Sequence, residues 1–132
     1  MGTKDKWPSA TSPENEDEKV FAQFSLSSKD EFPHPHGRIP TKYMGRTPDG
    51  MNDDMIWGLR KGISYPPETH SHGHILTIKH GFGVVSINGE EKNYTSGDVF
   101  DIGGNVPHGF VRVDETTIVV QRQPVHRFIK PI

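Results

Sequence analysis

The sequence predicts an all-β fold, built as an antiparallel sandwich or barrel. From residue 54 onward, seven short runs rich in β-branched and aromatic residues alternate with turn signals. One of these turns is Asn88-Gly89, the strongest two-residue hairpin signal, because both central positions of a type I′ turn need a positive φ. Glycine (14) and proline (11) make up about a fifth of the 132 residues, which leaves little room for long helices.

Length and composition favour one soluble domain. A chain of 132 residues normally builds a single core. We find no apolar run near the roughly 18 residues that span a bilayer, and the start of the chain does not look like a signal peptide. The net charge of -2 and the dispersed basic residues provide no surface for a phosphate backbone. We therefore expect a cytoplasmic protein that binds neither nucleic acid nor membrane.

Residues 1–30 are predicted to form a polar tail with one short element. Ser12 is a candidate helix cap, Pro13 suits the first helical position, and acidic residues follow them near the positive end of the helix dipole. A helix here would place Val20, Phe21 and Phe24 on one face. The alternative is an edge strand over residues 20–26, and the sequence does not decide between the two.

The rest of the chain divides into a strap and a barrel. Residues 31–53 are rich in proline and glycine and are predicted to be an irregular strap, whereas residues 54–128 are predicted to form the barrel. The strands expected in the barrel are residues 55–60, 69–80, 83–87, 92–95, 98–102, 108–113 and 116–123.

Histidines form the main candidate site. His70, His72 and His74 occupy every second position of a strand-like run, which points them to one face, and His108 begins another expected strand. Imidazole is the commonest protein ligand for transition metals, and the chain has no cysteine. On a flat strand the Cα atoms of His70 and His74 would lie about 13 Å apart. A shared ion therefore requires a kink, for which Gly73 is the candidate position.

Residues 97–108 resemble the second motif of the cupin superfamily. That motif reads glycine, five residues, proline, one residue, glycine, two residues, histidine, and every spacing matches this segment. Gly103 replaces the motif's proline and Asn105 its glycine, and both are turn formers. The histidine of the motif is His108.

The first cupin motif is also recognisable, with one departure. His70-Ser71-His72 matches its histidine pair, and counting seven residues back from Gly81 places the third ligand at His74. The family usually has three or four residues between the pair and the third ligand, whereas here only Gly73 intervenes. The resemblance covers roughly residues 56–123.

This resemblance implies a jelly-roll-like barrel that holds one divalent transition metal per chain. The implied ligands are His70, His72, His74 and His108, with His80 or water as alternatives to His74. Manganese or iron is favoured, followed by nickel, copper, cobalt or zinc. Related barrels often form homodimers through exchanged N-terminal segments, for which residues 20–26 are the candidate here.

The expected function is that of a metal-dependent enzyme acting on a small anionic or chelating molecule. We expect dioxygenase-type oxidation first and a redox-neutral isomerase, cyclase or lyase next, with a non-catalytic sensor or storage protein as the alternative. Strand alternation from His108 through Phe110 makes Arg112 a candidate contact for a substrate carboxylate, although an arginine there can equally reach solvent. The remaining histidines, His34, His36 and His126, are given no role.

Overall fold

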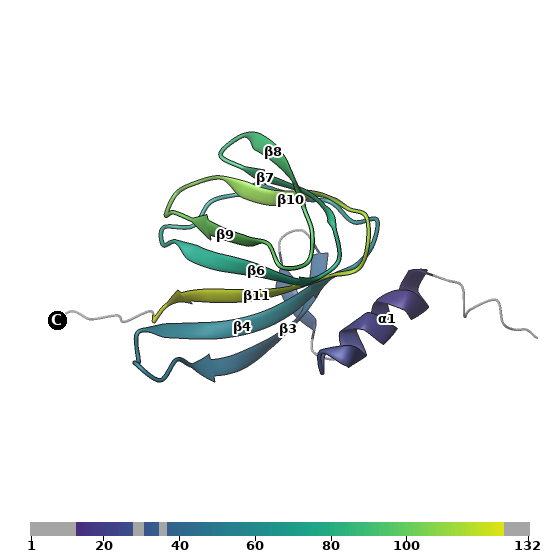
Figure 1. Cartoon of the computed structure of the whole chain (residues 1–132), viewed down its shortest axis with the longest axis horizontal. Helices are drawn as coiled ribbons and strands as arrows, with labels where there is room; N and C mark the ends of the chain where they lie inside the picture. The colour runs from purple at the N-terminus through teal and green to yellow at the C-terminus, as the bar shows by residue number, and fades with distance from the viewer. Residues whose placement is uncertain (1–12, 28–30, 35–36, 126–132) are drawn as a thin grey trace, which may run out of the picture.

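Two antiparallel sheets face each other in the computed structural model, which describes residues 13–27, 31–34 and 37–125 (Figure 1). The four-stranded sheet has the order β5-β10-β7-β8 and the six-stranded sheet the order β2-β3-β4-β11-β6-β9. The all-β prediction is confirmed. The elements are α1 (Pro13–Gln23), β2 (Glu31–His34), β3 (Gly37–Arg46), β4 (Asn52–Leu59), β5 (Tyr65–Glu68), β6 (His74–His80), β7 (Gly83–Ile87), β8 (Glu90–Tyr94), β9 (Val99–Ile102), β10 (His108–Val113) and β11 (Thr117–Pro124).

The main core fills the space between the two sheets. Leu76 and Val119 enter it from the six-stranded sheet, and Val85 and Phe110 enter it from the four-stranded sheet. Each of these side chains is at most 4% exposed. Burying such a side chain contributes roughly 1.5–3 kcal/mol relative to leaving it in water, so this core holds the sheets together.

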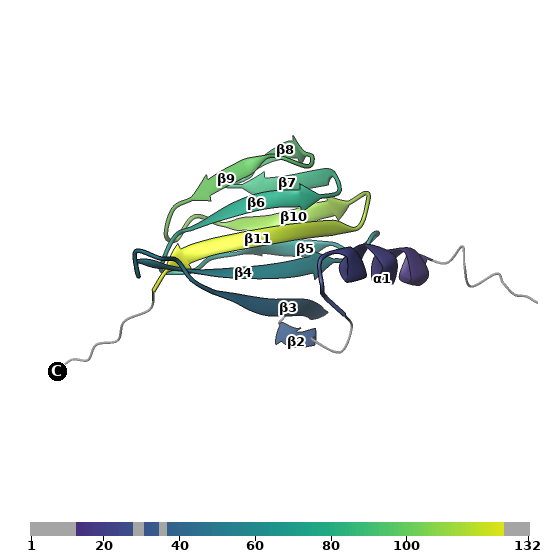
Figure 2. The ribbon, with the colours of Figure 1, turned by 60° about the horizontal axis from the view of Figure 1, so that its bottom comes forward.

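The N-terminal element is a helix. Figures 1 and 2 place α1 outside the space between the sheets. There Phe21 of α1 is fully buried and packs against Ile56 and Ile118, which form a second core cluster. Gly58 makes room for the ring, because a Cβ atom there would lie 2.4 Å from Phe21 Cε1. After the helix, Leu26 N donates to Phe21 O (2.9 Å), which closes its last turn. The segment proposed for exchange between subunits thus packs on its own chain as a helix end and turn.

A buried carboxylate fixes α1 to the barrel. Asp17 is 2% exposed, and its Oδ1 accepts hydrogen bonds from Thr116 Oγ1 (2.5 Å) and Lys61 N (3.1 Å). These two donors lie in separate loops, so the helix joins them at one end of the barrel.

Within the described residues, no helix has the length and apolar character needed to cross a membrane.

The prediction of an irregular strap over residues 31–53 is wrong, because much of this stretch forms strands of the six-stranded sheet. Proline has no backbone N–H, so the prolines of this stretch fit into a strand where that nitrogen needs no hydrogen bond to a neighbouring strand. Pro40 pairs with Glu31 of β2 and lies just before Thr41, the first residue of β3 that pairs with β4. Strand β5 was missed for a similar reason: it contains two prolines and lies at the edge of its sheet.

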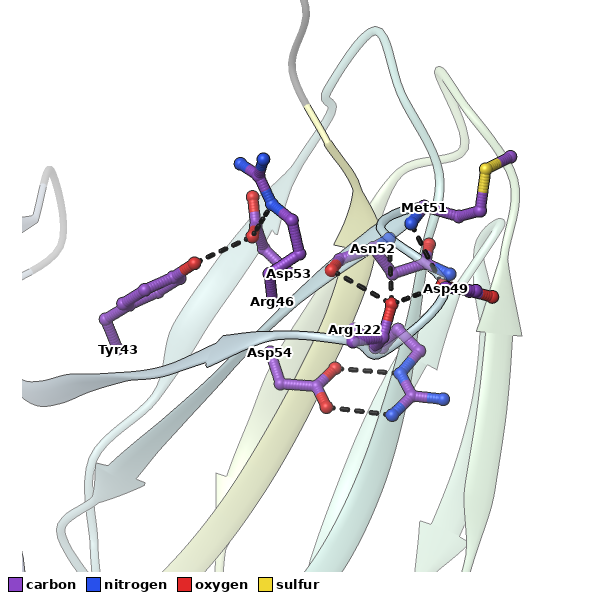
Figure 3. A network of polar contacts seen from close by, with 9 residues as sticks. Tyr43, Arg46, Asp49, Met51, Asn52, Asp53, Asp54 and Arg122 are labelled. Carbon is purple, nitrogen blue, oxygen red and sulfur yellow. Dashed lines mark hydrogen bonds and ion pairs between the residues drawn. The ribbon is translucent and has the colours of Figure 1, made fainter.

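Polar contacts order the hairpin between β3 and β4 (Figure 3). Tyr43 donates its hydroxyl proton to Asp53 Oδ1 (2.8 Å), which Arg46 Nε also contacts (3.2 Å). On the neighbouring strand Arg122 binds both carboxylate oxygens of Asp54, each at 2.8 Å, and these bonds lower the pKa of Asp54. The hairpin is therefore tied to β11 through charged groups at its exposed end.

The predicted hairpin turn at Asn88-Gly89 is confirmed. Asn88 (φ 54°) and Gly89 (φ 81°) both adopt positive φ, and Ile87 pairs with Glu90 across the turn. Such a two-residue turn matches the twist of the flanking strands, which explains why this dipeptide predicts the hairpin.

Candidate metal centre

Three imidazoles converge at one end of the barrel. The ligand nitrogens of His70, His74 and His108 all lie within 4.8 Å of one another. Ring centroids are 4.8 Å apart for His74 and His108, 5.1 Å for His70 and His108, and 5.5 Å for His70 and His74. His74 and His108 are the first residues of β6 and β10, whereas His70 precedes β6. Three segments of the chain therefore build the cluster.

A bend brings His70 back toward His74. The prediction of one strand over residues 69–80 is wrong for its first five residues, because β6 begins at His74 and residues 71–72 form a bend. The required kink is thus present, directly before Gly73. On a flat strand the two histidines would be too far apart to share an ion.

The turn at residues 103–105 packs against this bend and explains its shape. Asn105 N donates to His70 O at 2.6 Å. A Cβ atom at Gly73 would lie 2.6 Å from Ile102 O, and one at Gly104 would lie 2.6 Å from Ser71 O. The absence of side chains at both glycines therefore allows two backbone segments to approach each other closely, and this approach positions His70.

His108 has a defined ring orientation. Its Nδ1 lies 2.9 Å from Val106 O. Because a carbonyl oxygen only accepts hydrogen bonds, Nδ1 carries the proton of the neutral ring and Nε2 keeps its lone pair. A second hydrogen bond of this kind is the usual way in which proteins orient a metal-binding imidazole.

His74 is the most buried of the three. It is 5% exposed, and its Nδ1 is a buried polar atom with no hydrogen-bond partner among the described residues. Burial, assisted by the charges of His108 and His70, lowers the pKa of His74 to about 4. The ring is therefore neutral at pH 7, which is the form that binds a metal. A buried polar atom without a partner is costly, and coordination to a metal would compensate for it, so the residues fit a bound ion.

His72 is the one predicted ligand outside this group. Its ring centroid lies 6.2 Å from that of His70 and 6.5 Å from that of His74, and the side chain is half-buried. Because the chain bends at His72, its side chain no longer follows the alternation that we expected. Its role as a ligand stays a prediction.

His80 faces the other side of its sheet. Val119 pairs with Ile78 but Ile118 pairs with His80, so β6 has one extra residue, a β-bulge, at this point. The bulge reverses the alternation: His80 contacts Phe24 beside α1, and its Nδ1 lies 3.0 Å from Thr116 O. Strand alternation alone would place His80 on the face of His74, and the bulge removes it from that face.

Arg112 does not follow the alternation that begins at His108, because the pairing of β10 with β7 shifts its register between Phe110 and Arg112. Its side chain is 63% exposed and forms an ion pair with Asp114 at 2.8 Å. Arg112 is not among the residues that line the cavity beside the histidines. Of the other histidines, His34 ends β2, whereas His36 and His126 lie outside the described residues.

The three histidines line a cavity of about 240 Å³ between the sheets. Pockets that hold drug-sized ligands usually measure roughly 300–1,000 Å³, so this one suits a smaller molecule. Its walls are mainly apolar and aromatic, and the ring of Trp57 meets that of Phe110 edge to face at 5.9 Å. Polar groups are few, and besides the histidines they include Glu68 and Gln121.

Sequence reasoning missed both of these polar residues. Gln121 could have been found, because it follows Val119 by two positions in a strand and so shares its inward face. Glu68 offers no such signal, since it follows two prolines in a segment that looked like a loop.

Comparison with known proteins identifies the fold. No family model and no curated protein matches the chain. Among solved structures, KdgF from Halomonas sp. is similar over 74% of this chain and 87% of its own, with 23% identity and a TM-score of 0.61. The polyketide cyclase RemF from Streptomyces resistomycificus is similar over 70% of this chain and 72% of its own, with 21% identity and a TM-score of 0.58.

A third similar structure is a cupin 2 conserved barrel domain protein from Rhodopseudomonas palustris. It covers 77% of this chain and 74% of its own, with 15% identity and a TM-score of 0.65. Together with the two sheets and the histidine cluster between them, these likenesses show that the chain has the cupin fold.

Proposed function

We propose that this protein is a metal-dependent enzyme that performs redox-neutral chemistry on a small carbonyl or carboxylate compound. One observation carries the proposal: three imidazoles, one of them with a buried nitrogen that has no partner among the described residues, face a small and mainly apolar cavity. Three protein ligands leave coordination positions for a substrate, which distinguishes catalytic from structural metal sites.

The proposed ligands are His70, His74 and His108, with His72 as the candidate fourth. Because imidazoles are neutral ligands, they leave the charge of a divalent ion uncompensated, which favours an anionic substrate. Manganese or iron is our first choice of metal, and the ligand type also suits nickel, copper, cobalt and zinc. When bound, the ion would polarise a substrate oxygen as a Lewis acid.

Glu68 is our candidate for the proton-transfer group. It lines the same cavity from the end of β5, where it pairs in register with His108. It does not belong to the group of ligand atoms within 4.8 Å, so we assign it to the substrate rather than to the metal. A carboxylate beside a polarised carbonyl can accept a proton from the adjacent carbon, while the aromatic walls exclude water.

This carboxylate shifts our preference from oxidation to redox-neutral chemistry. Isomerisation, cyclisation and elimination each move a proton from carbon, and Glu68 lies in the cavity where such a proton acceptor would be needed. The similarity to the fold of a polyketide cyclase supports the same choice. A homodimer remains part of the proposal, and the mass of the protein in solution tests it.

Deuterium exchange tests the proposed reaction. In D2O, the metal-loaded protein should exchange the α-protons of at least one member of a panel of small 2-keto acids and β-diketones, as followed by NMR. Glu68→Gln should slow this exchange about 100-fold, within the 10²–10⁴-fold range typical of general acid–base groups. Its metal content should not change. Glu91→Gln, on the exposed strand β8, is the matched control and should exchange normally.

Three results would count against the proposal. Oxygen uptake that depends on the same compounds would favour a dioxygenase. Tight binding of a compound without exchange would favour a sensor or storage protein. Failure of the purified protein to take up any divalent transition metal would remove the basis of the proposal.

A further inference from the structure

Gln121 stands in the cavity wall with its carboxamide fixed by two hydrogen bonds. Trp57 Nε1 donates to Gln121 Oε1 (3.0 Å), and Gln121 Nε2 donates to Gln123 Oε1 (2.8 Å). An indole nitrogen only donates, so the oxygen of the Gln121 amide must face Trp57 and its nitrogen must face away. The orientation of this side chain is therefore set before any ligand binds.

The amide nitrogen has one hydrogen more than these bonds use. A carboxamide NH₂ group has two donors, and Gln123 accepts one of them. In the described part of the chain, the structure gives the second no partner. Thr41 also lines the cavity, but its hydroxyl proton is already donated to Ile39 O (3.0 Å) and is not available to a ligand. Gln121 thus offers the cavity a donor whose direction is fixed.

The positions of Gln121 and the histidines define two ends of a ligand. Gln121 belongs to β11, whereas His74 and His108 begin β6 and β10, and all of them line the same cavity. The edge-to-face rings of Trp57 and Phe110 form part of the wall of this cavity. Such walls suit a flat, apolar body, and the volume of about 240 Å³ limits it to a small one.

We propose that Gln121 orients the substrate by donating its second amide proton to an acceptor oxygen at the end remote from the metal. This inference rests on the proposed metal site and names the substrate class. The substrate carries a chelating oxygen group on one side of a small planar body and a carboxylate or carbonyl on another. Gln121 is then a residue that determines specificity, and Trp57 and Gln123 are its positioning partners.

Binding of three probes to the zinc-loaded protein tests this inference, because Zn²⁺ adds no redox chemistry. Catechol carries only the chelating group, whereas 2,3- and 3,4-dihydroxybenzoate add a carboxylate at two spacings. Isothermal titration calorimetry should show that the wild type binds at least one benzoate about 10-fold or more tightly than catechol, as expected for a hydrogen bond to a charged group.

Gln121→Glu is the sharpest variant. It keeps an oxygen for Trp57 Nε1 but replaces the donor by an acceptor, so the preference for the benzoate should disappear. The affinity for catechol should stay within about twofold, since only one side of the ligand is changed. Gln121→Met, which has neither donor nor acceptor, should lose the preference in the same way and serves if the glutamate variant does not fold.

Gln23→Glu is the matched control. It makes the same substitution at the exposed end of α1, away from the cavity, so it should keep the preference. The inference is overturned if Gln121→Glu and Gln121→Met retain the preference, if Gln23→Glu loses it equally, or if the wild type binds catechol and shows no preference. If the wild type takes up no zinc, or binds none of the three probes, the proposed metal site fails together with the inference.

Discussion

The two ends of strand β6 carry the same residue in opposite circumstances. His74 begins the strand, is 5% exposed, and has a buried nitrogen without a partner beside two other imidazoles. His80 ends the strand, is half-buried, and has its Nδ1 beside the carbonyl of Thr116. The sequence names His74 as the implied third ligand and His80 as an alternative to it. A candidate ligand therefore differs from a structural histidine in having a ring nitrogen to which no neighbouring group offers a hydrogen bond.

The largest expected effect of breaking this contrast is on metal binding. His74→Ala should weaken Zn²⁺ binding by roughly 100-fold or more, because even the loss of an outer-shell partner costs 10–100-fold. His80→Ala should leave it unchanged within about twofold. Calorimetric titration of the metal-free protein measures both, and comparable losses in the two variants would show that we have misplaced the site.

His72→Ala sharpens the same comparison. If His70, His74 and His108 alone hold the metal, the variant should still contain one metal ion per chain, as measured by elemental analysis. A loss as large as that of His74→Ala would instead support the four-histidine set that the sequence predicts.

Acid should lower the stability of the metal-free protein through His74. An unfolded histidine takes up a proton near pH 6.5, whereas His74 in the folded state does so only near pH 4. Between these values the unfolded state binds more protons, so stability falls as the pH is lowered from 6.5 to 4. The loss from this residue is at most about 3 kcal/mol.

Urea unfolding at pH 7 and pH 4.5 measures this loss. His74→Gln should show a smaller decrease than the wild type, because glutamine does not titrate. An identical decrease in the two proteins would contradict the assigned cause.

Glycines beside the two histidines provide the smallest and most local test. Gly81 has a φ of 98°, and a Cβ atom there would lie 2.4 Å from Thr116 O. Gly81→Ala should therefore cost about 1–3 kcal/mol of stability while leaving Zn²⁺ binding intact. Gly73→Ala should push the bend away from Ile102 O and weaken Zn²⁺ binding as well, by about 10-fold. Thermal unfolding and zinc titration separate the two effects, and equal zinc affinities would argue against the role of the bend.

The features that sequence predicted well are those specified by neighbouring residues. The Asn88-Gly89 hairpin is one, since its two residues set the turn. The sequence also named the three histidines that lie together, because their spacing resembles known motifs. The kink near Gly73 was expected because a shared ion requires one, but its form, a bend at residues 71–72, could not be predicted, since it depends on contact with the distant turn at residues 103–105.

The errors at β3, β5 and His80 have a related cause. Proline is compatible with a strand only where the sheet leaves its nitrogen unpaired, and this depends on which strands lie on either side. The bulge near His80 is likewise a property of the pairing between β6 and β11. Alternation within one strand carries no information about either feature, whereas it does place Gln121 on the inner face.

The contact between Asp17 and Thr116 also has a consequence for the order of folding. These residues are 99 positions apart in the chain. Helix α1 is therefore synthesised first but can dock only after the loop before the last strand is in place. A contact of such long range is costly in loop entropy, so we expect it to form late. In refolding experiments, the docking of α1 should therefore appear as the last kinetic phase, after the two sheets have enclosed the histidines.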